Sequence, residues 1–223
     1  MTRAPAPVNG SLRQLAGELP EGERFLVVVA ESLAALPRID ESLRTLGIAS
    51  AWQLLPGLYI GLVALRPDSL DRVVELLRRT AVGRVGVSPL YDDAERIESA
   101  CRLARTAFKA STAGELVTVF DRAPLTMVAV ADVEVAHRVV QVVLGGLDDL
   151  PRDDREVLLD TLAAWSTHNG NAADTAVHLY VHPNTVRYRL RRLEERTGRS
   201  LTDPRAAAEL ILALECHLRR KAS

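Results

Sequence analysis

The sequence is poor in cysteine and in long apolar runs, and each shortage excludes a class of protein. Its two cysteines, Cys101 and Cys216, both fall in apolar helical patterns, so we expect buried free thiols rather than a disulfide framework or a metal site. No apolar run approaches the length of a membrane span, and the N-terminus lacks the apolar segment of a secretory signal. These absences favour a cytoplasmic protein that has no membrane partner.

Catalytic and cofactor motifs are absent as well. There is no glycine-rich phosphate loop, and no serine or cysteine nucleophile lies in a recognisable motif. Asp174, His178 and His182 are spaced four residues apart, but a turn is predicted between the two histidines and no third strong ligand is evident. The sequence therefore predicts no metal, no cofactor and no enzymatic activity.

What is present is a chain built from alanine, leucine and valine. Hydrophobic residues make up 48% and aromatic residues 4% of it, as in globular proteins rich in helix. The net charge of −1 argues against a surface that binds nucleic acid everywhere. Residues 151–223 nevertheless hold 12 Lys and Arg against 10 Asp and Glu, whereas residues 1–150 hold 16 against 19. The sign of this asymmetry suits a nucleic-acid-binding module at the C-terminus.

Residues 168–197 have the pattern of a helix-turn-helix. Asn171 can cap a first helix that runs to about Leu179, and a three-residue turn follows. Pro183 is tolerated as the first residue of a second helix because its missing N–H would be unpaired there. Gly198 is a suitable stop for that helix.

The second helix separates an apolar stripe from a positively charged face. Val186, Leu190 and Leu193 recur at i, i+4 and i+7, which predicts one buried side. Between Pro183 and Thr197 there are five arginines against two glutamates, and both acids lie near the C-terminal end. A helix that enters the major groove needs such donors near its N-terminus, although a solvated, arginine-rich helix of a bundle would also fit the charge alone.

These residues carry a resemblance to a known family. Asn169-Gly170-Asn171, followed by the run His182 to Leu190, resembles the C-terminal helix-turn-helix of PucR/CdaR-type bacterial transcriptional regulators. The resemblance implies binding to double-stranded DNA by a homodimer on paired half-sites. It also leads us to expect that the N-terminal sensor region of the family is missing from this chain.

Position on the helix pair gives each polar residue a predicted role. Base edges are expected to be read by His182, Asn184, Thr185, Arg187 and Tyr188. Phosphates are expected to be held by Arg189, Arg191, Arg192 and the amide end capped by Asn171. For Tyr188 two interpretations remain open, an outward aromatic that contacts DNA and a partly buried aromatic at the edge of the helix.

The first half of the chain predicts an α/β domain. Apolar runs at 24–30, 49–65, 84–88 and 115–120 are typical of strands, and helical patterns at 32–46, 67–80 and 92–110 lie between them. Pro37 should break or kink the first of these helices, and Pro56-Gly57 should form the turn of a hairpin. The order of elements predicts a ferredoxin-like split βαβ plan, and it resembles a GGDEF-like domain.

The acids that nucleotide cyclisation requires in this fold are missing. Two-metal phosphoryl chemistry needs paired carboxylates. The predicted hairpin tip, 55–58, has no acid, and after the first strand only Glu31 is available, which we interpret as a solvated residue at a helix start. The resemblance thus implies a degenerate, non-catalytic GGDEF-like domain.

We expect an α+β protein in which this α/β domain is followed by an all-α helix-turn-helix domain. The predicted parts are a tail at 1–20, a GGDEF-like domain at 21–122, a connector helix at 123–150 and a DNA-binding domain at 151–223. The apolar helix 135–144 could pack on its own domain or form a dimer. An alternative function is a sensing module whose α/β domain binds a nucleotide or another small-molecule effector.

Overall fold

A computed structural model describes residues 24–92 and 96–222. The chain divides into two compact units, with the boundary between Met127 and Val128. The predicted tail at 1–20 lies outside the described residues.

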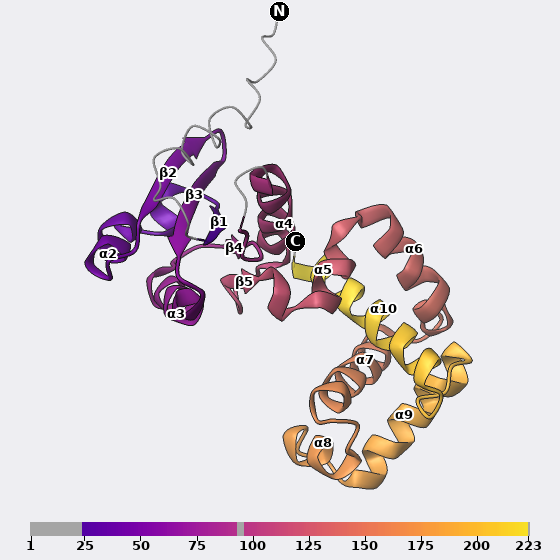
Figure 1. The fold of residues 1–223 in the computed structure, drawn as a ribbon. Helices are drawn as coiled ribbons and strands as arrows, with labels where there is room; N and C mark the ends of the chain where they lie inside the picture. Colours follow the sequence, from indigo (N-terminus) through magenta and orange to yellow (C-terminus); the bar gives the residue numbers. More distant parts are fainter. Residues whose placement is uncertain (1–23, 93–95, 223) are drawn as a thin grey trace, which may run out of the picture. The chain divides into compact units, whose positions relative to one another are not determined.

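The first unit is a mixed sheet with helices on both faces (Figure 1). Its elements are β1 (Arg24–Ala30), η1 (Leu33–Ala35), α2 (Ile39–Thr45), β2 (Ser50–Leu55), β3 (Leu58–Leu65), η2 (Pro67–Ser69), α3 (Leu70–Thr80), β4 (Val85–Val87), α4 (Ile97–Ala110), β5 (Val117–Val119), η4 (Phe120–Arg122) and α5 (Pro124–Ala131), which crosses the boundary. The strand order is β2-β3-β1-β4-β5, with only the β4–β5 pair parallel. The first four strands confirm the predicted ferredoxin-like plan, and β5 extends it by one strand.

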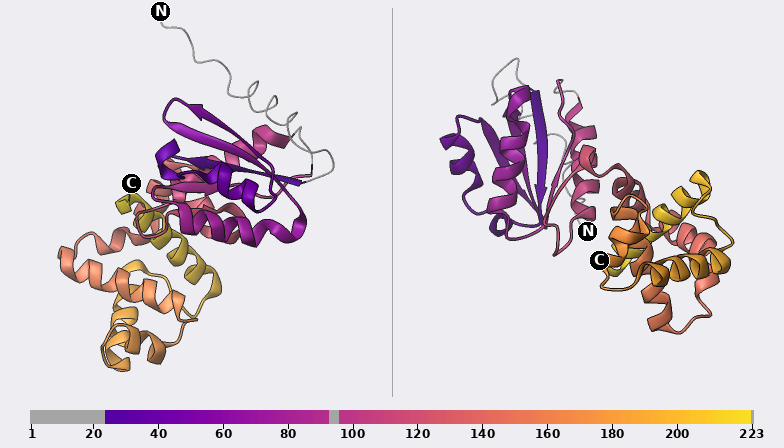
Figure 2. Two further views of the ribbon diagram at one scale, coloured as in Figure 1. Left: turned by 90° about the vertical axis from the view of Figure 1, so that its left-hand side faces the viewer. Right: turned by 90° about the horizontal axis from the view of Figure 1, so that it is seen from below.

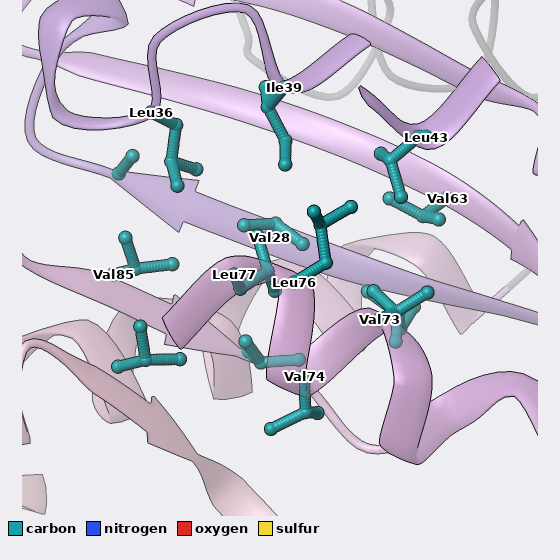
Figure 3. Close-up of a cluster of buried hydrophobic side chains, with 14 of the residues drawn as sticks. Val28, Leu36, Ile39, Leu43, Val63, Val73, Val74, Leu76, Leu77 and Val85 are labelled. Atoms are coloured by element: carbon teal, nitrogen blue, oxygen red, sulfur yellow. The ribbon is translucent and has the colours of Figure 1, made fainter. Parts of the chain in front are cut away.

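Alternate residues of β1 fill two cores. Leu26, Val28 and Ala30 face α2 and α3, and belong to the cluster drawn in Figure 3. Val27 and Val29 face α4 on the other side of the sheet. The ribbon of Figure 2 shows α4 on that side. All five are completely buried, which explains why this strand reads as a continuous apolar run rather than an alternating one.

The predicted hairpin is confirmed. Leu55 of β2 pairs with Leu58 of β3, so Pro56 and Gly57 form a two-residue turn. Gly57 has φ +75°, a conformation that L side chains rarely adopt. The turn brings the hairpin tip to the end of the sheet at which β1 also ends, because Ala30 pairs with Tyr59.

The helical segment after β1 is broken at Pro37, one of the two outcomes predicted for it. It forms the single turn η1 and then the separate helix α2, with Pro37 between them. Arg38 has φ +53°, a left-handed conformation that a continuous right-handed helix cannot contain. The break lets Ile39 and Leu43 turn inward, where both are at most 1% exposed.

The second unit is entirely helical. It contains α6 (Val133–Leu144), η5 (Gly145–Leu147), α7 (Arg152–Thr167), α8 (Ala172–His178), α9 (Pro183–Thr197) and α10 (Pro204–Ala222). Its main core joins α6, η5, α7, α9 and α10. A smaller core joins α8 to α9, and Trp165 of α7 packs against both cores, so α7 supports the helix pair.

Helix α6 has two different faces. Val140, Val143 and Leu144 are buried in the main core, as expected for a helix that packs on its own domain. Val135 and Val142 are 60% and 55% exposed on another side of the helix. Domain packing therefore accounts for only part of the apolar surface of α6.

Candidate nucleic-acid interface

The first helix of the pair, α8, begins at the predicted cap. The Asn171 side-chain oxygen accepts hydrogen bonds from the backbone N–H groups of Ala173 at 2.8 Å and Asp174 at 3.4 Å. Gly170 before it has φ +74°, which permits the tight entry from α7. Because the cap uses Oδ1, the exposed Asn171 amide can still donate with Nδ2.

The second helix of the pair, α9, begins with a cap that the sequence analysis did not predict. His182 is its N-cap residue, and Nδ1 of the ring accepts a hydrogen bond from the backbone N–H of Asn184 at 3.2 Å. Pro183 occupies the first turn, as predicted. The cap holds the imidazole at the N-terminal end of α9, with Nδ1 directed at the backbone.

The buried stripe of α9 is confirmed. Val186 and Leu193 are fully buried and Leu190 is 7% exposed. Val186 and Leu190 pack on Ala176 of α8, while Leu193 belongs to the main core. The stripe fixes the rotation of α9 about its axis and so decides which side chains face outward.

The predicted DNA-binding residues divide into an outward group and a flanking group. The exposed residues are Asn171, His182, Asn184, Arg187, Tyr188 and Arg191. The half-buried residues are Thr185, Arg189 and Arg192. Tyr188 is 64% exposed, so it is an outward aromatic and not a partly buried one at the helix edge.

Three arginines of α9 remain electrostatically available. Within residues 24–92 and 96–222, Arg187, Arg189 and Arg191 form no ion pair with a carboxylate, and Arg187 donates to the neutral Asn184. Arg192 differs, because it donates to Asp154 of α7 at 2.9 Å. To contact a DNA phosphate, Arg192 would therefore have to release Asp154 or bind both groups at once.

The C-terminal end of α9 is held firmly. Gly198 caps it in the left-handed conformation, with φ +67°. The Glu194 carboxylate accepts hydrogen bonds from the backbone N–H of Leu201 at 2.6 Å and from the Ser200 hydroxyl at 3.1 Å. Both glutamates that the sequence places at this end thus lie away from the arginine-bearing half, and one of them orders the following loop.

Two exposed apolar residues lie next to α9 in the chain, and the sequence analysis did not identify either of them. Tyr180, in the turn, is 96% exposed and has φ +54°. Val177, one turn of helix earlier, is 77% exposed. From the sequence, Tyr180 is predicted only to lie in the turn. No sequence pattern indicates that its side chain is so exposed.

The histidines near the turn do not form a metal site in the part of the chain that is described. No three His, Cys, Asp or Glu side chains there are grouped to hold an ion. The rings of His178 and His168 contact each other at a tilt, with centroids 4.8 Å apart, while His182 is engaged as a cap.

The end of the sheet in the first unit was the other candidate site. Glu31 is not simply solvated, since its carboxylate pairs with Nε of Arg84 at 3.2 Å. The Arg84 guanidinium also lies over the Phe108 ring, 5.0 Å from its centroid. Glu31, Ser32 and residues 54–58 line a hollow of about 420 Å³ with mostly apolar walls.

Comparison with known domain families identifies both parts of the chain. Residues 158–216 match the PucR C-terminal helix-turn-helix domain, and residues 12–110 match the GGDEF-like domain. The first match contains α8, the turn and α9. The chain thus contains a PucR-type helix-turn-helix domain and a GGDEF-like domain, the two domains that the sequence predicted.

Individual relatives support the same class. The purine catabolism regulatory protein of Bacillus subtilis (strain 168) is 42% identical over 71 residues, which are 32% of this chain and 13% of that protein. The transcriptional activator PmfR of Paenarthrobacter nicotinovorans is 29% identical over 195 residues, 87% of this chain and 40% of its own. The carbohydrate diacid regulator of Escherichia coli (strain K12) is 45% identical over 49 residues, 22% of this chain and 13% of its own.

The chain spans between 13% and 40% of the length of these three relatives. A solved structure, the regulator of polyketide synthase expression from Bifidobacterium adolescentis, aligns with 95% of this chain and 91% of its own at 23% identity, with a TM-score of 0.40. Among the described residues, no helix combines the length and the apolar character that crossing a membrane requires.

Proposed function

We propose that this chain regulates transcription by binding duplex DNA sequence-specifically through α9. The observation that carries the proposal is the outward face of this helix from Asn184 to Arg191. Asn184, Arg187, Tyr188 and Arg191 are exposed there, and the two arginines make no ion pair with a carboxylate in the described part of the chain. Amide and guanidinium groups at the start of a helix are the donors that read base edges in the major groove.

The proposal assigns each residue the role that the sequence predicted for it. Base reading is assigned to His182, Asn184, Thr185, Arg187 and Tyr188. Phosphate binding is assigned to Arg189, Arg191, Arg192 and the Asn171 amide. Arg191 is the most accessible of the phosphate-binding arginines, whereas Arg192 is tied to Asp154 in the absence of DNA.

The experiment starts from a random pool of duplexes, from which the chain should enrich a defined sequence. Binding of the enriched duplex is then compared between the parent chain, Arg187→Ala and Arg79→Ala. Arg79 is exposed on α3 and gives the same change of charge outside the helix pair. We expect only Arg187→Ala to weaken binding, and a pool that shows no enrichment would refute the proposal.

The functional unit in this proposal is a homodimer on paired half-sites. One helix-turn-helix contacts a single half-site, and two-fold symmetric operators match two-fold symmetric proteins. The exposed valines of α6, Val135 and Val142, offer apolar surface that the domain core does not use. Light scattering at working concentration should give twice the mass of one chain, and a monomer would exclude this arrangement.

A second candidate function rests on the hollow at the end of the sheet. Its lining contains one carboxylate, from Glu31, and neither lysine nor arginine, so it suits an apolar, uncharged effector better than a nucleoside triphosphate. A thermal shift with panels of nucleotides and small metabolites tests it, because a ligand of the folded state raises the melting temperature. No shift with any compound would remove the support for effector binding by this unit.

The proposal includes a non-catalytic first unit and a cytoplasmic location. Glu31 is the only carboxylate that lines the hollow, and Arg84 neutralises it. Paired carboxylates for two metal ions are not found among those lining residues. Incubation with GTP and Mg²⁺ should therefore leave the nucleotide unchanged, and turnover would overturn this part of the proposal.

A further inference from the structure

Two adjacent glycines follow α6, and the structure gives them different surroundings. A methyl group added to Gly145 would meet only a carboxylate oxygen of Asp148, 3.9 Å away. A methyl group added to Gly146 would lie 1.9 Å from the carbonyl oxygen of Arg196 and 2.9 Å from its carbonyl carbon. Neither glycine has a positive φ, so backbone conformation does not require glycine at either position.

Gly146 therefore marks a direct contact between two backbones. Arg196 belongs to the last turn of α9, and Gly146 belongs to η5, which follows α6 without an intervening residue. Leu147 of η5 and Leu193 of α9 are fully buried in the same core on either side of this contact. No flexible side chain lies between the two backbones to absorb a movement.

This contact lies at the anchored end of the recognition helix. The nine steps along the helix from Arg187 to Arg196 span about 14 Å, so Gly146 is remote from the proposed base readers. Cβ atoms essentially never lie closer than 3.0 Å to other atoms, so a methyl group at Gly146 would force η5 and the end of α9 apart by about 1 Å. Binding geometry must be held within about 0.5 Å, so such a displacement is large enough to matter for base reading.

We propose that Gly146 is a positioning residue, through which the end of α6 sets the position of the recognition helix on DNA. The proposal rests on the proposed function. It makes the α6–η5 segment a point of control, because any ligand or partner that shifts the end of α6 shifts the base-reading residues with it. Such control needs no direct contact between that partner and DNA.

The test uses two matched variants of the full chain. Gly146→Ala and Gly145→Ala add the same methyl group to neighbouring residues, and only the first creates the clash. We expect Gly146→Ala to bind the enriched duplex about tenfold more weakly, the size of effect that one mismatched base pair produces. Its affinity for unrelated duplexes, which depends on overall charge, should not change. Gly145→Ala should match the parent chain on both duplexes.

A third variant distinguishes a loss of stability from a change in the position of α9. Leu147→Ala removes a fully buried side chain but leaves the Gly146 contact without a clash. It should lower the melting temperature while keeping the ratio between specific and non-specific affinity. If Gly146→Ala lowers both affinities in parallel, or loses its helical circular dichroism signal, Gly146 is needed for folding and the positioning role is rejected.

A measurement without DNA keeps this inference separate from the proposed function. Amide NMR shifts of residues 193–198 should differ between Gly146→Ala and the parent chain, and agree between Gly145→Ala and the parent. Equal shifts in both variants would overturn the positioning role even if the parent chain binds DNA. If the parent chain enriches no duplex, the proposed function fails, and the proposed control of DNA reading fails with it. The NMR comparison then decides only whether Gly146 positions α9.

Discussion

Arg187 donates a hydrogen bond from Nη1 to the side-chain oxygen of Asn184, at 2.9 Å, one turn earlier on the recognition helix. Both side chains are exposed, and no buried charge requires this bond. The bond holds the guanidinium along the outer surface of α9 in a limited range of orientations. A preoriented guanidinium loses less side-chain entropy when it binds a guanine edge.

Arg187→Ala should weaken binding to the enriched duplex by about 1–3 kcal/mol and relax the preference at one base pair. Arg187→Lys is the matched control, since it keeps the charge but cannot make a bidentate contact. Both variants should lose discrimination, while Arg187→Lys keeps its affinity for unrelated DNA. Fluorescence anisotropy with single-base variants of the duplex measures this, and full discrimination by Arg187→Lys would show that Arg187 contacts only phosphate.

Asp154→Asn should strengthen binding to DNA of any sequence. The substitution removes the charge that holds Arg192 and adds one net positive charge beside the recognition helix. The slope of the logarithm of the binding constant against the logarithm of salt concentration should become steeper by about one unit. Because both partners are partly exposed, stability should change by less than about 1 kcal/mol. An unchanged slope would mean that Arg192 does not reach a phosphate.

Asn171→Ala should loosen α8, because it leaves the N–H groups of Ala173 and Asp174 without their side-chain acceptor. Loss of such a cap costs about 0.5–2 kcal/mol, so hydrogen exchange of the α8 amides should become several-fold faster. Asn171→Asp restores an acceptor oxygen and should restore protection. Equal protection in all three chains would contradict the capping role.

The stability of the helical unit should depend on pH through His217. The pKa of His217 is lowered from 6.5, first by burial and then by the positive charges of Arg155, Lys221 and Arg220, while Glu156 acts in the opposite direction. Below pH 6.5 the unfolded chain therefore binds more protons than the folded chain. The free energy of unfolding should fall as the pH drops from about 6.5 towards the folded-state pKa.

Denaturant unfolding between pH 7 and pH 5 measures this effect. His217→Gln should flatten the dependence, because glutamine does not titrate. His137→Gln is the control, since His137 is exposed on α6, and it should leave the dependence unchanged. An equal pH dependence in the His217→Gln chain would assign the effect to other groups.

Local signals were sufficient to predict much of the fold. Asn171, Pro183 and Gly198 each act through the backbone within a few residues, so the limits of α8 and α9 follow from sequence. Pro56-Gly57 fixed the hairpin in the same way. The continuous apolar run of β1 identified a central strand that is buried on both faces.

Features that depend on distant residues could not be predicted. Arg192 meets Asp154 across 38 positions, and Glu31 meets Arg84 across 53. The contact of Gly146 with Arg196 exists only once α6 and α9 are packed. Spacing along the chain carries no information about such pairs, which arise from tertiary packing.

The most direct test of the account is to map the enriched duplex onto the chain by NMR. Titration into the ¹⁵N-labelled protein should shift the amide signals of residues 180–191 and the side-chain signals of Asn184 and Arg187, while signals of the α6 valines remain in place. Shifts that cluster elsewhere on the protein, with residues 180–191 unaffected, would contradict the claim that the outward half of α9 reads DNA.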